Sequence, residues 1–146
     1  MDKAAEISGR PSVVLADDNA GMRAKVIALL KPEFDILKDV ADGAELIQAV
    51  GSINPDIAIV DITMPRIRGI EAVRQLMDSG SKVRVVFLTV HEDPDFARAA
   101  ADSGAYAFVV KSRMAADLIP AMRSAIAGEW FSSLEISAVE SKARFG

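Results

Sequence analysis

The stretch Asp56-Ile57-Ala58-Ile59-Val60-Asp61-Ile62-Thr63-Met64-Pro65 decides the fold and points to a site. Ile57 to Val60 is apolar at every position and rich in β-branched residues, which is typical of a strand buried on both faces of a parallel sheet. Asp61 follows at the carboxyl end of this strand, and ligands of open α/β sheets bind just outside those ends. Taken alone, Asp61 fits a turn before Pro65 as well as it fits a site residue.

Around this stretch, apolar strands alternate with amphipathic helices. Short β-branched runs predict the strands, and hydrophobic residues recurring three and four positions apart predict the helices. The predicted strands are 12–16, 34–40, 57–60, 83–89 and 105–110, and the predicted helices are 20–31, 42–50, 70–78, 94–103 and 116–126. The alternation predicts an α/β fold, a single doubly wound (βα)5 domain with right-handed crossovers and helices on both faces of a parallel five-stranded sheet.

Pro120 falls inside the apolar pattern of the last helix, where a proline removes a hydrogen bond and clashes with the preceding turn. We therefore expect this helix to begin late, near Ala116 or Asp117, or to kink. Ser112 to Ala115 would then form a looser segment. The alternative is an undisturbed helix that tolerates the proline.

Composition excludes several classes of protein. The 146 residues suit one domain, and no apolar run is long enough to span a membrane. The charged first ten residues lack the core of a signal peptide, so we expect a cytoplasmic protein. The absence of cysteine excludes disulfides and thiolate sites, and a single histidine disfavours a zinc site. A net charge of −4 without a basic run argues against direct nucleic-acid binding.

Polar side chains follow four of the five predicted strands. Asp17 and Asp18 come after the first strand, Asp61 follows the third, Thr89 ends the fourth, and Lys111 follows the fifth. In the flavodoxin-like strand order 2-1-3-4-5, the switch point lies between strands one and three. The three carboxylates are therefore expected to converge at one edge of the sheet.

Such a cluster indicates metal and phosphoryl chemistry. Three neighbouring carboxylates repel one another unless a cation is bound, and Mg2+, or Mn2+ in its place, prefers such oxygen ligands. A carboxylate can itself accept a phosphoryl group, whose oxygens the ammonium of Lys111 and the hydroxyl of Thr89 would contact. Each residue also has an ordinary structural role, as a helix cap, a strand residue or a solvated strand end. Their joint placement at one edge favours the phosphoryl site.

On these residues the chain resembles the receiver domain of two-component response regulators, from Ser12 to about Gly128. The resemblance rests on Asp17-Asp18, on Asp61-Ile62-Thr63-Met64-Pro65 with Gly69, on Thr89, and on Gly104 followed by Phe108-Val109-Val110-Lys111. It implies residues 1–11 as a flexible lead-in, 12–128 as the receiver domain, and 129–146 as a tail or the start of a linker.

The resemblance also implies roles for single residues. Asp61 would be the phospho-acceptor, and Asp18, Asp61 and the backbone carbonyl of Thr63 would bind Mg2+ directly, with Asp17 acting through water. Lys111 would pair with the phosphoryl group. Thr89 and Phe108 would form a switch pair. Independently of the resemblance, the β-branched Val90 directly follows Thr89, so we expect it to overhang the phosphoryl oxygens and shield them from water; the alternative is that it only packs against its neighbours.

The partners implied are a sensor histidine kinase or a phosphotransfer protein, and a second copy bound through the fourth helix, fifth strand and fifth helix. The segment after the last strand most resembles receivers of the NarL/FixJ group, which precede a LuxR-type output domain. Through such an output domain a receiver controls transcription. The receiver itself is expected to be no enzyme beyond catalysing its own phosphorylation and dephosphorylation. Ser112 stands where many receivers have proline, which puts the usual cis peptide after Lys111 in doubt.

Two other readings remain open at this point. A degenerate receiver would bind partners without phosphorylation, against which the complete set of site residues argues. A phosphatase of the haloacid dehalogenase type also has a nucleophilic Asp after a strand, but it usually carries a second Asp two residues later, where this chain has Thr63.

Overall fold

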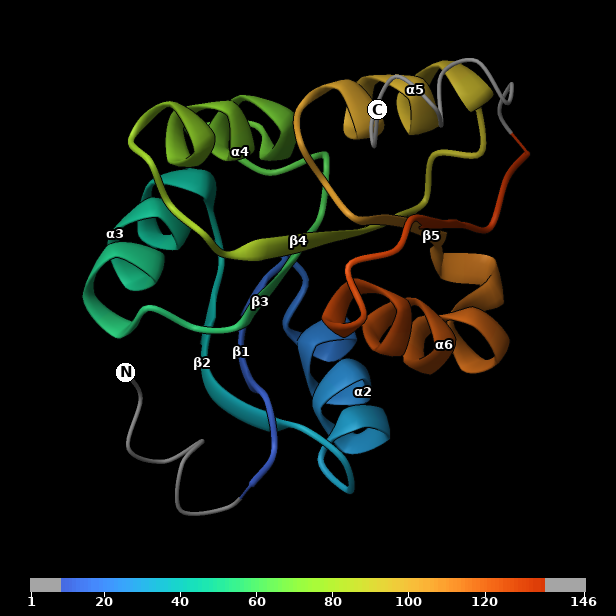
Figure 1. Cartoon of the computed structure of the whole chain (residues 1–146), viewed down its shortest axis with the longest axis horizontal. Helices are drawn as coiled ribbons and strands as arrows, with labels where there is room; N and C mark the ends of the chain where they lie inside the picture. Colours follow the sequence, from blue (N-terminus) through green and yellow to red (C-terminus); the bar gives the residue numbers. More distant parts are fainter. Residues whose placement is uncertain (1–8, 136–146) are drawn as a thin grey trace.

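The computed structural model describes residues 9–135. Its helices and strands alternate along most of the chain (Figure 1). They are β1 (Ser12–Ala16), α2 (Ala20–Leu30), β2 (Asp35–Val40), α3 (Gly43–Ile53), β3 (Ile57–Val60), α4 (Gly69–Asp78), β4 (Arg84–Thr89), α5 (Pro94–Asp102), β5 (Ala107–Val110), a 3-10 helix (Lys111–Arg113), α6 (Met114–Ile126) and β6 (Phe131–Ser132).

The strands form one parallel sheet in the order β2-β1-β3-β4-β5-β6. The predicted doubly wound fold and the order of its first five strands are therefore confirmed. The two-residue strand β6, which pairs with β5, was not predicted. Parts of the expected lead-in and tail, residues 1–8 and 136–146, lie outside the described residues.

Helices cover both faces of the sheet (Figure 1). One face packs a hydrophobic cluster against α3, α4 and α5, and the other packs a second cluster against α2 and α6. Every residue of β1, β3 and β5 is buried, as expected for strands enclosed on both faces. This packing fixes the strand ends that carry the polar residues of the site.

Local capping explains where several helices begin. The side chain of Asp42 accepts from the backbone N–H of Glu45 at 2.8 Å, and Asn19 and Asp93 cap α2 and α5 in the same manner. Helix α3 ends at Ile53, beyond the predicted residue 50, and Asn54 closes it in the left-handed conformation with φ of 54°.

The expected late start of the last helix is wrong. Helix α6 begins at Met114, directly after the 3-10 helix, and Pro120 lies within it. The guanidinium of Arg113 donates to Asp117 at 2.8 and 3.2 Å and so holds the first turn of the helix in place. Ala116, whose carbonyl loses its helical partner to the proline, is exposed, so water can bind that carbonyl.

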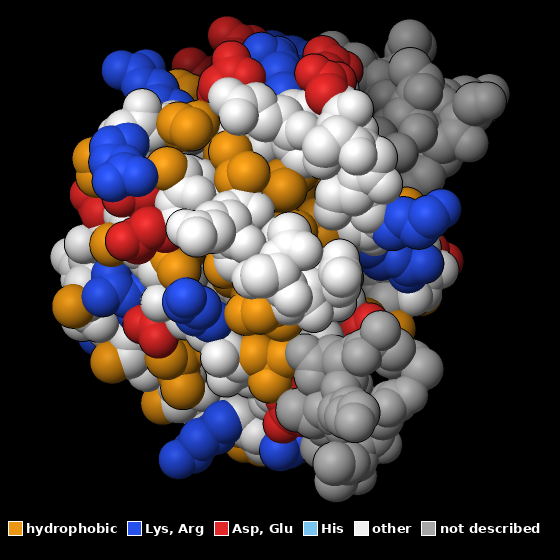
Figure 2. Space-filling model, turned by 90° about the vertical axis from the view of Figure 1, so that its left-hand side faces the viewer, with side chains coloured by type: hydrophobic (Ala, Val, Ile, Leu, Met, Phe, Trp, Pro, Cys, Tyr) orange, Lys and Arg blue, Asp and Glu red, His pale blue; other side chains and the backbone are white. Residues whose placement is uncertain are grey.

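Two observations concern the surface. Within residues 9–135, no helix combines the length and the apolar character needed to cross a membrane. Figure 2 views the molecule from the side of α3, and on that face acidic and basic side chains are interspersed with hydrophobic ones. The described residues of this face form no large area of a single charge.

Candidate functional site

Three carboxylates meet at the carboxyl edge of the sheet. Asp17 and Asp18 follow β1 and Asp61 follows β3, and one carboxylate oxygen of each lies within 4.8 Å of the others. Asp17 and Asp61 are buried, whereas Asp18 is exposed. The structure thus brings together the three residues that the sequence placed at the switch point.

The backbone around Asp61 holds its carboxylate toward the cluster. Its N–H donates to the carbonyl of Ala16 at 3.0 Å, which extends the pairing of β1 and β3 by one residue. The N–H of Thr63 donates to Asp61 Oδ1 at 3.3 Å. Gly69, at the start of α4, approaches so closely that a Cβ there would lie 2.2 Å from the Asp61 carbonyl oxygen. Any other residue at position 69 would push the backbone of Asp61 and Ile62 outward.

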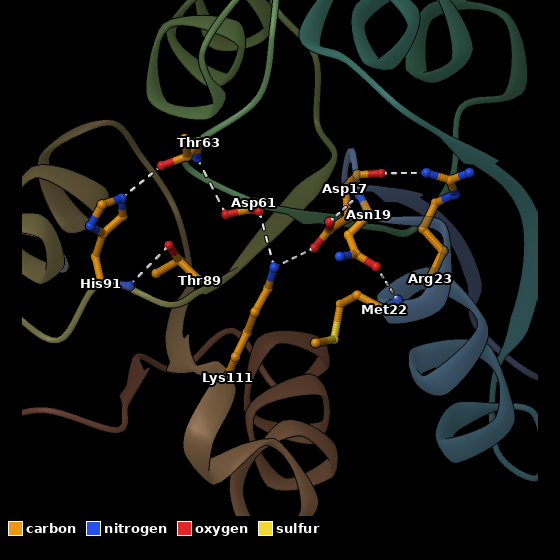
Figure 3. Close-up of polar contacts among 9 residues, drawn as sticks. All are labelled: Asp17, Asn19, Met22, Arg23, Asp61, Thr63, Thr89, His91 and Lys111. Atoms are coloured by element: carbon orange, nitrogen blue, oxygen red, sulfur yellow. Dashed lines mark hydrogen bonds and ion pairs between the residues drawn. The ribbon is translucent and has the colours of Figure 1, made fainter.

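Lys111 enters the cluster from the end of β5. Its Nζ lies 2.7 Å from Asp17 Oδ2 and 3.1 Å from Asp61 Oδ2, as Figure 3 shows. Burial acts to lower the pKa of the Lys111 ammonium, but the hydrogen bonds and charges of Asp17 and Asp61 outweigh it and raise that pKa. Lys111 is therefore a fixed positive charge between two carboxylates.

The charge state of Asp61 responds to its surroundings. Burial raises the pKa of the Asp61 carboxyl, and the negative charge of Asp17 adds to this effect. The charge of Lys111 and the N–H of Thr63 oppose it. Since burial prevails, another cation beside Asp61 would favour its ionised, nucleophilic form.

Asp17 is held by the start of α2. Its Oδ1 accepts from the N–H of Asn19 at 2.8 Å, and its carbonyl accepts from Arg23 at 2.6 Å. Arg23 also donates to Asp39 at 2.8 Å. With Lys111 on its other oxygen, Asp17 cannot turn away from the cluster without losing these contacts.

Thr89 and Phe108 are fully buried on neighbouring strands, where Phe87 pairs with Phe108 and Thr89 with Val110. The hydroxyl of Thr89 accepts from the N–H of His91 at 3.3 Å. Among the described residues, no hydrogen bond joins Thr89 to Asp61 or Lys111. Thr89 thus lies at the edge of the site with its hydroxyl engaged elsewhere.

Sequence reasoning missed His91, which it considered only as a zinc ligand. Its Nε2 lies 2.7 Å from Thr63 Oγ1, as Figure 3 shows. Its ring stacks on Phe96 with centroids 4.2 Å apart. His91 therefore joins the loop after β3 to the loop after β4. Its place two residues after Thr89 was the available signal.

The donor set fits a divalent cation of the Mg2+ type. Carboxylate oxygens from three side chains lie close together, and Asp18 is exposed on the outer side, where a hydrated ion would approach. The described residues bring no sulfur or imidazole into this cluster, so the chemistry favours Mg2+ or Mn2+ over zinc.

A doubly wound sheet with three carboxylates and a lysine at its switch point defines a class of protein, the phosphoryl-accepting signalling domains. The family model of the response regulator receiver domain matches residues 13–123. The chain belongs to this family, whose members accept phosphoryl groups in two-component signalling and bind Mg2+ through an acidic pocket. Membership in this signalling family removes the haloacid dehalogenase reading.

The relatives are transcriptional regulators. The chain is 33% identical over 113 residues to the transcriptional regulatory protein DegU of Brevibacillus brevis, which covers 76% of this chain and 48% of that one. It is 29% identical over 119 residues to the transcriptional regulatory protein LiaR of Bacillus subtilis, and the match covers 80% of this chain and 56% of LiaR. The chain thus spans about half the length of these curated relatives.

Solved structures give the same assignment. A two-component response regulator of the LuxR family from Aurantimonas sp. SI85-9A1 superposes with a TM-score of 0.82 at 28% identity, covering 94% of this chain and 99% of that one. A LuxR-family DNA-binding response regulator from Staphylococcus aureus superposes with a TM-score of 0.74 at 25% identity, and the match covers 79% of this chain and 98% of that one. The predicted similarity to the NarL and LuxR group is therefore confirmed.

Proposed function

We propose that Asp61 is the residue of this receiver that takes the phosphoryl group. The observation that carries the proposal is the position of its carboxylate, at the end of β3, 3.1 Å from Lys111 Nζ and within the cluster of Asp17 and Asp18. In the reaction, an oxygen of Asp61 forms a bond to phosphorus while the bond between phosphorus and the donor breaks, and the donor leaves with the electron pair.

The surrounding side chains stabilise the transferred group. The Lys111 ammonium offsets negative charge on the phosphoryl oxygens, for which it gives up part of its contact with the carboxylates. Asp18, Asp61 and the backbone carbonyl of Thr63 would hold Mg2+ or Mn2+ directly, and Asp17 would act through water. When bound, the cation supplies positive charge toward the same oxygens.

The switch response follows from the contacts of Thr89. In the phosphorylated state its hydroxyl exchanges the N–H of His91 for a phosphoryl oxygen, and Phe108 fills the space behind it. The phosphoryl group favours this state by its differential contacts.

The donor would be a sensor histidine kinase or a phosphotransfer protein in the cytoplasm. The signal would pass to an output domain or partner that controls transcription, and a second copy would bind through α5, β5 and α6.

The experiment is intact-mass analysis after incubation with acetyl phosphate and Mg2+. We expect the wild-type chain to gain the mass of one phosphoryl group, and Asp61→Asn to gain none. Asp78→Asn, which changes an exposed carboxylate at the end of α4, serves as the matched control and should label like wild type. Full labelling of Asp61→Asn, or labelling that persists in EDTA, would contradict the assignment. A wild-type chain that never labels would favour a phosphorylation-independent binding module.

A further inference from the structure

Residues 130–134, here called the clip, run along the free edge of β5. The N–H of Phe131 donates to the carbonyl of Tyr106 at 3.1 Å, and the N–H of Ser133 donates to the carbonyl of Phe108 at 2.8 Å. The clip therefore pairs as a sixth parallel strand and covers part of the edge that β5 would otherwise present.

Side chains of the clip alternate between the two faces of the sheet. Trp130 and Leu134 pack on the cluster beneath α5, to which Phe108 also belongs, whereas Phe131 packs on the cluster beneath α6. All three are only partly buried. The clip thus adds apolar contact on both faces. Because it is short and has few hydrogen bonds, we expect it to have low local stability.

Ser133 ties the clip to both ends of the segment that begins at Lys111. Its hydroxyl accepts from the N–H of Val110 at 3.3 Å and donates to Asp117 Oδ2 at 2.7 Å. Val110 directly precedes Lys111, and Asp117 lies in the first turn of α6. Asp117 is buried and is also held by Arg113, the last residue of the 3-10 helix. One hydroxyl therefore spans the chain from just before the site lysine to just after the 3-10 helix.

We propose that the clip is a phosphorylation-responsive cover, seated on the β5 edge in the unphosphorylated chain and released when Asp61 is phosphorylated. Release uncovers the backbone groups of Tyr106, Phe108 and Val110 that the clip covers at the β5 edge. This inference rests on the proposed function of Asp61.

The direction follows from the contacts of Lys111. In the unphosphorylated chain its ammonium binds Asp17 and Asp61, and a phosphoryl group changes the position at which this charge is held. Because Ser133 bridges Val110 and Asp117 on either side, a shift of the Lys111 backbone changes the distance that the bridge must span. The same event moves Phe108, whose carbonyl accepts from Ser133. Both changes act on hydrogen bonds that hold the clip, and we infer that they loosen it.

Coupling between two sites is reciprocal, so loosening the clip should favour the phosphorylated conformation. Ser133→Ala removes the hydroxyl bridge and keeps the backbone bonds. It should raise the apparent affinity for beryllofluoride with Mg2+ by about two- to fivefold, because only the part of the hydroxyl's two hydrogen bonds that differs between the two states contributes. Ser132→Ala is the matched control, because within residues 9–135 the Ser132 hydroxyl accepts from a residue of the clip itself, the N–H of Leu134 at 3.1 Å. Ser133→Thr, which keeps the hydroxyl, should restore the wild-type affinity.

The chain carries its own reporter, because Trp130 is its single tryptophan. Beryllofluoride with Mg2+ should shift the Trp130 emission to longer wavelength and speed amide exchange at Phe131 and Ser133. Intact mass after acetyl phosphate treatment is measured in parallel. If Asp61 labels while the emission and the exchange stay unchanged, or the exchange slows, clip release is wrong and the proposed function stands. If Asp61 does not label, both clip release and the proposed function of Asp61 are wrong. Equal affinities of Ser133→Ala and wild type for beryllofluoride with Mg2+ would show that Ser133 does not couple the clip to the site.

Discussion

The side chains of Thr63 and His91 meet near Asp61, with 2.7 Å between Thr63 Oγ1 and His91 Nε2. The His91 ring is held from behind by its stack on Phe96. The loops after β3 and β4 are thereby joined beside the Asp61 carboxylate, which accepts from the N–H of Thr63. Because the Thr89 hydroxyl accepts from the N–H of His91, the bridge also connects the loop after β3 to Thr89.

We expect His91→Ala to shorten the lifetime of the phosphorylated chain. Loss of the bridge frees the loop after β4 and opens a path for water, and one hydrogen bond corresponds to about a fivefold change in rate. The loss of label over time, followed by intact mass, gives the rate. Glu92→Ala alters the neighbouring exposed side chain and should decay like wild type. Equal decay of His91→Ala and wild type would show that the bridge has no part in the lifetime.

The sequence predicted the sheet and the acidic cluster because their signals are local. Runs such as Ile57–Val60 and caps such as Asp42 fix strand and helix positions, and parallel strands bring their ends to one edge. The bridge of Thr63 and His91 joins two loops 28 residues apart, and no local pattern encodes it. Strand β6 has two residues, fewer than any periodicity can mark. Val90 is 64% exposed, and its shielding role stays a prediction.

We expect Asp61→Asn to stabilise the protein in metal-free buffer at neutral pH, by about 0.5–2 kcal/mol. Burial raises the folded-state pKa of Asp61 above its ordinary value of 3.8, so the folded chain binds more protons than the unfolded chain just above that pH. Stability therefore falls as pH rises through this window, and an amide at position 61 abolishes the fall. Denaturant unfolding with and without EDTA measures the difference.

Added Mg2+ should reverse the order of stability. At a Mg2+ concentration a hundredfold above Kd, ligand linkage stabilises the wild-type chain by about 2.7 kcal/mol. Asp61→Asn loses a proposed ligand and should gain less. Asp78→Asn should behave as wild type in both buffers. An equal response of all three chains to Mg2+ would place the cation elsewhere.

Asp117 should contribute stability that disappears in acid. The hydrogen bonds of Arg113 hold the pKa of Asp117 below its ordinary value of 3.8, with Ser133 adding to the effect and burial opposing it. For an acid with a lowered folded-state pKa, the contribution is complete above 3.8 and is lost as pH falls through the folded-state value. Asp117→Asn should therefore be less stable than wild type at neutral pH, and the two unfolding free energies should converge at low pH. A difference that is constant from neutral to acid pH would show that the charge of Asp117 is not its source.

Pro120 is the position where a substitution should stabilise the fold without touching the site. It lies in the interior of α6 with no N–H to donate to Ala116, and its side chain is exposed, so alanine adds a helical hydrogen bond and creates no cavity. We expect Pro120→Ala to raise the free energy of unfolding by about 1–3 kcal/mol, the size of the penalty for an interior proline after allowance for the freer unfolded chain. Pro94→Ala is the matched control, because Pro94 is at the start of α5, where no helical bond is lost, and its replacement should bring no gain. Chemical denaturation of both variants makes the comparison, and equal stabilities for Pro120→Ala and wild type would mean that α6 already accommodates the proline without strain.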